Sequence, residues 1–337
     1  MDDNRRKRRR GVLAAVIAGA MIASGVGIGL WATDTGPFRA ADYCWGAWQE
    51  NSGPDFLSGE ALGDSGERSA TDSAPPAAGR PRATCTVELT SSPEDGRVIL
   101  EYGAVPAGAE ERRRWIAENL NGSLSPLPDG LPGLVAADRG VLVLPAECDA
   151  DGRPVTLTVR SSGFSMAPRS GVGRLLVDAA DALMEKAGCA PERPLRLTSP
   201  LVKVSEEDLS AGTPLCRIPG VTFAYGRDAH YQEQVGVVGD RLQTCSAWFG
   251  SRGGSGQLVA QFVMAGEPRL VALFTGLPEG DDKGLVRARC DGRETVFYGD
   301  IRPGLQGHGQ PDDRRVFGNF VTSVSKRIGC ATEGGTR

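Results

Sequence analysis

The sequence predicts an α+β protein made of two tandem duplicated domains, each an antiparallel sheet covered by a C-terminal helix, preceded by one transmembrane helix. Three observations predict this architecture. The phrase "LMEKAGCAP" near the middle of the chain is echoed by "VSKRIGCAT" near its end, eight cysteines divide into two groups of four, and an uncharged segment follows a basic N-terminus. The 337 residues are sufficient for about two domains of ordinary size.

The N-terminal segment predicts a membrane anchor. Residues 1–10 contain six basic and two acidic residues and are expected to form a cytoplasmic tail, because basic flanks stay on the cytoplasmic side. Residues 11–31 carry no charge and would span roughly 31 Å as a helix, enough to cross a bilayer. A cleaved signal peptide is the alternative, although "GLWATDTG" lacks a small-residue cleavage site. A retained anchor and a cleaved signal peptide both place the body outside the cytoplasm. The retained anchor also predicts a single-pass protein of the cell membrane.

Small residues recur at every fourth position of this segment, at Ala15, Gly19, Ala23 and Gly27. Such a stripe allows two membrane helices to pack closely, so dimerisation through residues 11–31 is one interpretation. Glycine is also frequent in membrane spans in general, and the stripe then has no specific meaning.

The charge of the body argues against one class of partner. The net charge is −4, but residues 1–10 carry +4, so the rest of the chain carries −8. An acidic body is a poor candidate for binding nucleic acid, and no nucleic-acid partner is expected.

The surroundings of the cysteines indicate a duplication. "ATCTVEL" around Cys85 matches "QTCSAWF" around Cys245, and the match continues without a gap into the following strand. Near the end of each unit, apolar residues with a helical period precede a glycine, which is common at helix C-termini, and a cysteine. We therefore place the first unit at residues 41–189, the second at 213–330, and a linker at 190–212.

The second unit shows the expected element order most clearly. "RLQTCSAWF", the turn "GSRGGSG" and "QLVAQFVMA" predict a hairpin. "RLVALFTGL", "GLVRARC" and "ETVFYGDI" are expected to follow as strands, and a helix over 313–328 closes the unit. Strands in succession followed by a helix indicate an antiparallel sheet covered on one face.

The first unit contains two insertions. Residues 49–83 are rich in Ser, Gly, Pro and Ala and are expected to be a mobile insertion. "EERRRWIAENL" predicts an amphipathic helix with Trp115, Ile116 and Leu120 available for packing. The arginines at 112–114 are interpreted as a solvated helix face, with binding of an anion or an acidic polymer as the alternative.

The cysteines are expected to form disulfides, because the chain is exported and their number is even. Two self-contained units leave three pairings in each unit, and we predict the sequential one, since the closing helix returns its cysteine to the preceding strand. No C-x-x-C pair suggests zinc or redox catalysis, so no metal and no cofactor are expected. The predicted pairs are Cys44–Cys85, Cys148–Cys189, Cys216–Cys245 and Cys290–Cys330.

Candidate catalytic residues are few. His230 lies in "GRDAHYQEQ" near Asp228 and Glu233, and His308 lies in a Gly-rich loop. A histidine can act as a general base, but neither has a nucleophile motif beside it. The acidic groups "SEEDL", "EGDDK" and "QPDDRR" lack the spacing of a calcium-binding loop and are interpreted as solvated loops. The catalytic residues are therefore unknown, with His230, Asp228 and Glu233 as candidates.

The cysteine pattern resembles a group of known proteins. An early Cys, a Thr-Cys before an aromatic strand, a Cys ending a late strand and a final helix with a Cys are similar to four-cysteine secreted or lipid-anchored envelope proteins of high-GC Gram-positive bacteria. Those families are mostly of unknown function, so the resemblance implies an extracytoplasmic address and disulfides but no catalytic residues. The 33 arginines against 5 lysines are typical of a GC-rich bacterial genome. This chain departs from the group in lacking a lipid-anchor cysteine and in placing its last cysteine after the helix.

Two functions are expected from these features. The first is a membrane-anchored extracytoplasmic envelope protein that acts as a non-enzymatic binding or structural module, with an envelope protein, a polymer or a small ligand as its partner. The second is an extracytoplasmic hydrolase with an atypical site near His230.

Overall fold

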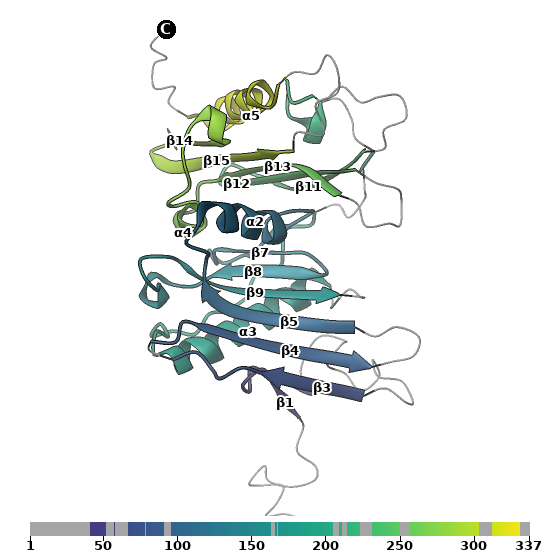
Figure 1. Ribbon diagram of the computed structural model, residues 1–337, viewed down its shortest axis with the longest axis vertical. Coiled ribbons are helices and arrows are strands. Elements are labelled where there is room, and N and C mark those ends of the chain that lie inside the picture. Colours follow the sequence, from purple (N-terminus) through teal and green to yellow (C-terminus); the bar gives the residue numbers. More distant parts are fainter. Residues whose placement is uncertain are drawn as a thin grey trace, which may run out of the picture. The chain divides into compact units, whose positions relative to one another are not determined.

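Figure 1 shows a computed structural model of the chain, in which two antiparallel sheets lie within the unit of residues 42–337. The structure describes residues 41–51, 57, 67–77, 79–90, 96–162, 166, 168–204, 209–210, 214–222, 231–249, 257–302 and 312–330. The predicted membrane segment, residues 11–31, lies outside the described residues. Within the described part of the chain, no helix has the length and apolarity needed to span a membrane.

The fold is mixed α+β with antiparallel sheets, as predicted. A two-stranded hairpin, β1 (Asp42–Tyr43) and β2 (Trp48–Gln49), precedes a seven-stranded sheet of order β3-β4-β5-β9-β8-β7-β6. The strands of this first sheet are β3 (Glu67–Asp72), β4 (Arg82–Thr90), β5 (Gly96–Ala104), β6 (Ser125–Pro126), β7 (Gly133–Val135), β8 (Arg139–Val143) and β9 (Val155–Ser162).

The second sheet has six strands in the order β10-β11-β12-β13-β15-β14. Short 3-10 turns at 146–148, 215–217 and 281–283 and the helices α2 (Ala109–Asn119), α3 (Arg169–Ala187), α4 (Pro268–Ala272) and α5 (Asp313–Ile328) complete the described elements. The strands of the second sheet are β10 (Leu209–Ser210), β11 (Tyr231–Val238), β12 (Leu242–Phe249), β13 (Gln257–Ala265), β14 (Leu285–Cys290) and β15 (Arg293–Ile301).

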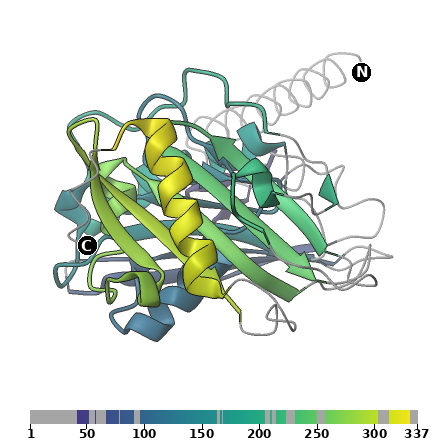
Figure 2. The ribbon, with the colours of Figure 1, turned by 90° about the horizontal axis from the view of Figure 1, so that it is seen from above.

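One five-strand order occurs in both sheets. Chain order and hydrogen bonding match β3, β4, β5, β9 and β8 of the first sheet with β11, β12, β13, β15 and β14 of the second. A helix follows each set, α3 against β8 and β9 and α5 against β14 and β15. Figure 2 shows α5 crossing the strands of the second sheet.

Each closing helix packs an apolar face on its own sheet and ends at a glycine. Gly188 after α3 and Gly329 after α5 have φ of 75° and 70°, a left-handed conformation that glycine adopts without steric cost. Phe317 of α5 lies directly on the backbone of β15, where a Cβ at Gly299 would come within 2.5 Å of its ring. These contacts form two separate apolar clusters, one around α3 and one around α5.

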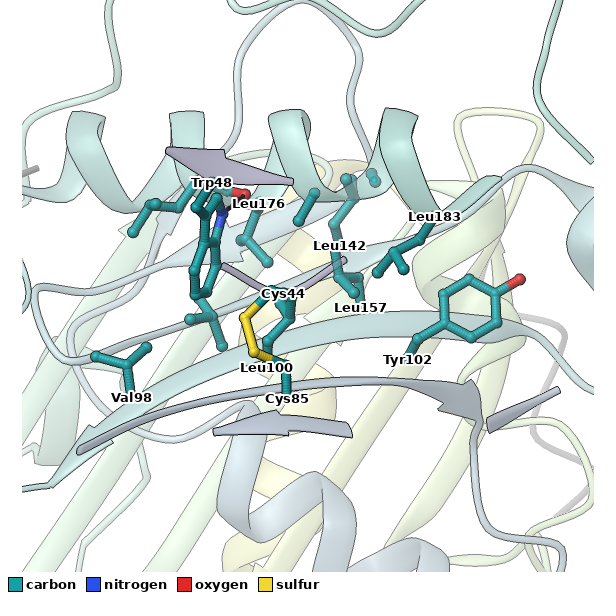
Figure 3. Close-up of a cluster of buried hydrophobic side chains, with 14 of the residues drawn as sticks. Cys44, Trp48, Cys85, Val98, Leu100, Tyr102, Leu142, Leu157, Leu176 and Leu183 are labelled. Carbon is teal, nitrogen blue, oxygen red and sulfur yellow. Dashed lines mark hydrogen bonds between the residues drawn. A yellow bond between two sulfur atoms is a disulfide. The ribbon is translucent and has the colours of Figure 1, made fainter. Parts of the chain in front are cut away.

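The four disulfides join consecutive cysteines: Cys44–Cys85, Cys148–Cys189, Cys216–Cys245 and Cys290–Cys330. This is the sequential pairing that the sequence predicts. The first bridge lies in the core under α3, beside Trp48 and Leu100 (Figure 3). The indole of Trp48 donates to the Leu175 carbonyl at 3.1 Å, so the N-terminal hairpin is attached to both the sheet and the helix.

One expectation about an individual segment is wrong, and two further segments contain elements that were not predicted. "RLVALFTGL" does not form a strand, because Pro268 opens helix α4 and the Glu267 carboxylate caps it by accepting from the Leu270 N–H at 2.8 Å. The insertion 49–83, predicted to be mobile, contains edge strand β3, whose residues pair with β4 from Glu67↔Thr90 onward. The segment 190–212, predicted as a linker, contains β10 and packs three leucines against the first cluster.

A third apolar cluster joins the two halves of the body, which are the first sheet with α2 and α3 and the second sheet with α4 and α5. Ile116 of α2 and Leu120, which directly follows this helix, lie in it with Val141 of β8 and Val263 of β13. Polar contacts cross the same boundary, since the Gly122 N–H donates to the Ser246 hydroxyl at 3.0 Å. The halves therefore share one buried interface within residues 42–337.

Arg112 of α2 is buried in this interface, which corrects its interpretation as part of a solvated helix face. Its guanidinium donates to the carbonyls of Pro106 at 2.6 Å and Leu273 at 2.8 Å, from opposite halves. Burial lowers the pKa of Arg112 to about 10, and repulsion by Arg153 adds to this, so the group remains charged near neutral pH. Arg114 on the same helix is exposed and pairs with Glu110 one turn away, as a solvated residue should.

Candidate binding groove

A groove of about 500 Å³ lies between strand β11, helix α5, the turn after Cys216 and the extended segment 202–204. This volume is within the range of roughly 300–1,000 Å³ that small-molecule sites occupy. Its lining is mostly apolar and is contributed by segments far apart in the chain. The main apolar side chains are Val202, Val204, Ile218, Val235, Val238 and Val324.

The wall at residues 216–219 is held in place from three directions. Cys216 is tied to β12 by its disulfide with Cys245. The Cys216 N–H donates to the Glu233 carboxylate of β11 at 2.6 Å, and the Ser323 hydroxyl of α5 donates to the Pro219 carbonyl at 2.6 Å. Because Cys216 has a φ of 51°, unfavourable for a non-glycine residue, these contacts are needed to maintain the turn.

The opposite wall belongs to the segment that follows the first half. Asp129 accepts hydrogen bonds from the Thr198 N–H at 2.6 Å and from the Ser199 N–H at 3.0 Å. The Ser199 hydroxyl donates to the same carboxylate. This bond, as the largest contributor, and the two N–H bonds lower the pKa of Asp129 to about 2. The Val204 carbonyl then accepts from the Arg169 guanidinium at 2.9 Å. The wall is therefore fixed at both ends by the first half.

The groove exposes apolar side chains that a folded protein normally covers. Among the described residues, three large apolar side chains are classed as exposed: Val202 at 54%, Val238 at 52% and Phe249 at 46%. Two of the three, Val202 and Val238, line the groove. Grouped exposed apolar side chains are typical of a binding surface, whereas scattered ones carry no such meaning.

The charged residues of the groove have one sign. Lys203, Arg217 and Arg327 line it, and none of its described lining residues is acidic. Arg327 is partly neutralised by Asp240 at 3.5 Å and also donates to the Gln243 side chain at 2.7 Å. Lys203 and Arg217 are exposed to solvent. A cationic groove in an acidic body favours ligands with negative charge.

Of the candidate catalytic residues, Glu233 lies within the described residues. Asp228, His230 and His308 lie outside them. Glu233 is described and buried, and its carboxylate accepts the Cys216 N–H, so its established role is to hold the turn of the groove wall.

Two of the acidic sequences come together in a second cavity of about 440 Å³. Asp281 and Asp282 of "EGDDK" and Asp312 and Asp313 of "QPDDRR" line it with Asp300. Arg113, Lys283 and Arg314 are interspersed among these carboxylates, and the Lys283 ammonium lies 2.9 Å from the Asp282 carboxylate. Three cations therefore offset part of the charge of the five carboxylates in this cavity.

Side chains of the types that coordinate metal ions come together at one place among the described residues, where Cys44, Asp72 and Cys85 approach one another. Both sulfur atoms belong to the Cys44–Cys85 disulfide and are not available to coordinate a cation.

The groove was not predicted from the sequence. Its signal is present in "LVKV", which is part of the predicted linker, and in "VGVV", a short apolar run for which no element was predicted. Only their approach in space turns the runs into one surface.

No protein-family model, curated protein or solved structure matches this chain.

Proposed function

We propose that this protein is an exported binding module, tethered to the cell membrane by residues 11–31, whose groove between β11 and α5 binds a ligand with an extended apolar part. The groove carries the proposal, because its walls are preorganised by a disulfide and hydrogen bonds while Val202 and Val238 remain exposed. Four disulfides are compatible with an extracellular body. No catalytic step is part of the proposal.

The body is also proposed to be a tandem duplication. The shared five-strand order supports this, and so do two repeated backbone irregularities. Cys44 and Cys216 have φ of 52° and 51°, and the Asp-Gly turns at Asp151 and Asp291 have φ of 53° and 49°. Uncommon conformations at matching positions are better explained by common descent than by chance. The binding groove lies at the second copy, where segment 202–204 completes it.

Loss of the exposed valines should weaken binding without unfolding the protein. The full chain in phosphatidylcholine nanodiscs would be labelled with a diazirine-bearing dodecanol, and the labelled peptides would be identified by mass spectrometry. We expect peptides containing residues 202–204 and β11 to be labelled. Each of these valines is about half exposed, and a bound ligand would cover that apolar surface. The double variant Val202→Ser/Val238→Ser removes this gain in binding free energy and should reduce the labelling about tenfold.

Phe249→Ser is the matched control, since it removes an exposed apolar side chain outside the groove. Labelling of the groove should be unchanged in this variant. Equal loss in both variants, or labelling confined to other surfaces, would contradict the proposed ligand site.

The membrane tether predicts a specific protease pattern in cells. Protease added to intact cells without their wall should digest the body, while a tag placed before residue 1 remains protected in the cytoplasm. The reason is the basic flank of residues 1–10, which is retained on the inner side. A body that resists digestion until the membrane is permeabilised would show the opposite orientation, and release of the body without detergent would show cleavage.

A further inference from the structure

We propose that the groove selects a single-chain amphiphile with an anionic headgroup, its chain lying along the valines and its headgroup between Lys203 and Arg217. This inference rests on the proposed function and adds the chemical class of the ligand. It is carried by the position of the charges relative to the apolar lining.

The apolar part of the site comes from three segments of the chain. Strand β11 supplies Val235 and Val238, helix α5 supplies the buried Val324, and the wall opposite supplies Val202. A ligand that covered these side chains would remove exposed apolar surface from water at two valines that are each about half exposed. An extended hydrocarbon chain would bury this apolar surface favourably, whereas a strongly polar ligand would lose its own hydration on covering it.

The polar part of the site lies at its two exposed cations. Arg217 directly follows Cys216 on the fixed turn and also has a positive φ of 57°, so its backbone position is set by the disulfide-bonded wall. Lys203 lies on the facing segment between two groove valines, Val202 and Val204. The site therefore carries one exposed cation on each wall, and a carboxylate or phosphate headgroup is the chemical class that pairs with both.

Arg327 has a different role from the other two cations. Its guanidinium donates to the Gly239 carbonyl at 3.0 Å and to Gln243, and it pairs with Asp240. These partners fix Arg327 against the end of β11, where it adds positive potential to the groove. Lys203 and Arg217 are thus the residues that distinguish headgroups.

The test compares three diazirine probes of equal chain length on the full chain in phosphatidylcholine nanodiscs: dodecanoate, dodecanol and dodecyltrimethylammonium. We expect dodecanoate to label the groove peptides about fivefold to tenfold more than either other probe, since two partly exposed ion pairs contribute modestly each. Lys203→Gln/Arg217→Gln should abolish this preference while leaving labelling by dodecanol in place.

Lys326→Gln is the control, because it removes an exposed cation from the same helix as Arg327 but outside the groove lining. It should preserve the preference for dodecanoate. Equal groove labelling by all three probes would overturn the headgroup inference and leave the proposed function intact. Absence of groove labelling by every probe would overturn both.

Discussion

Replacing Cys290 and Cys330 by alanine is expected to lower the free energy of unfolding of the body by about 4 kcal/mol. The disulfide closes a loop with a sequence separation of 40 residues, and in the chain-entropy account a cross-link of this length restricts the unfolded chain by that amount. The bridge also attaches the end of α5 to the end of β14. Urea unfolding of the oxidised full chain, followed by fluorescence, would measure the loss.

A comparison with Cys148→Ala/Cys189→Ala makes this result specific. That bridge has a separation of 41 residues and follows the corresponding helix, α3, so its removal should cost a similar amount. Groove labelling should survive the loss of Cys290–Cys330, because the groove wall is held by Cys216–Cys245. An unchanged unfolding midpoint would contradict the structural role, and a cross-link between the halves in a non-reduced digest would contradict the pairing.

Arg112→Met is expected to lower the free energy of unfolding by about 2–3 kcal/mol. Methionine keeps much of the apolar stem but has no donors, so the carbonyls of Pro106 and Leu273 lose their charged partner inside the interface. The variant also avoids the free-energy cost of burying a charged group, which offsets part of the loss. Because these carbonyls belong to the two halves, the variant should also reduce the cooperativity of unfolding, measured as a smaller dependence of stability on urea.

Arg114→Met provides the control for Arg112. It lies on the same helix, but its side chain is exposed and pairs with Glu110 one turn away. Its replacement should change stability by no more than about 0.5 kcal/mol. If the two variants are equally stable, the buried contacts of Arg112 do not hold the halves together.

The elements that the sequence predicted well are those with a local chemical signature. Helix α5 was expected at 313–328 and occupies Asp313–Ile328, because an apolar period of a helix ends at a glycine. The hairpin of β12 and β13 follows from two β-prone runs separated by a glycine-rich stretch. The repetition of the cysteines limited the disulfides to three pairings in each unit, and the return of the closing helix to the preceding strand favoured the sequential pairing that is observed.

Other features depended on contacts that are distant in the chain. The run "RLVALFTGL" is apolar enough for a strand or a helix, and the proline and the Glu267 cap decide for the helix. Strand β3 has a polar composition typical of a loop, and its order comes from backbone pairing with β4, which does not depend on apolar side chains.

Arg112 and the groove also depended on contacts between segments that are distant in the chain. A basic residue in a basic run is assigned to solvent by composition, and only the meeting of α2 with the second sheet supplies the carbonyls that keep a buried guanidinium hydrogen-bonded. The groove likewise requires segment 202–204 to lie opposite β11, although the chain between them contains the turn after Cys216. The sequence by itself determined the closing helices and the strands around the cysteines, because these elements are encoded by local period and spacing. The interface and the groove were decided by the tertiary structure, because burial and the sharing of one surface are properties of several segments together.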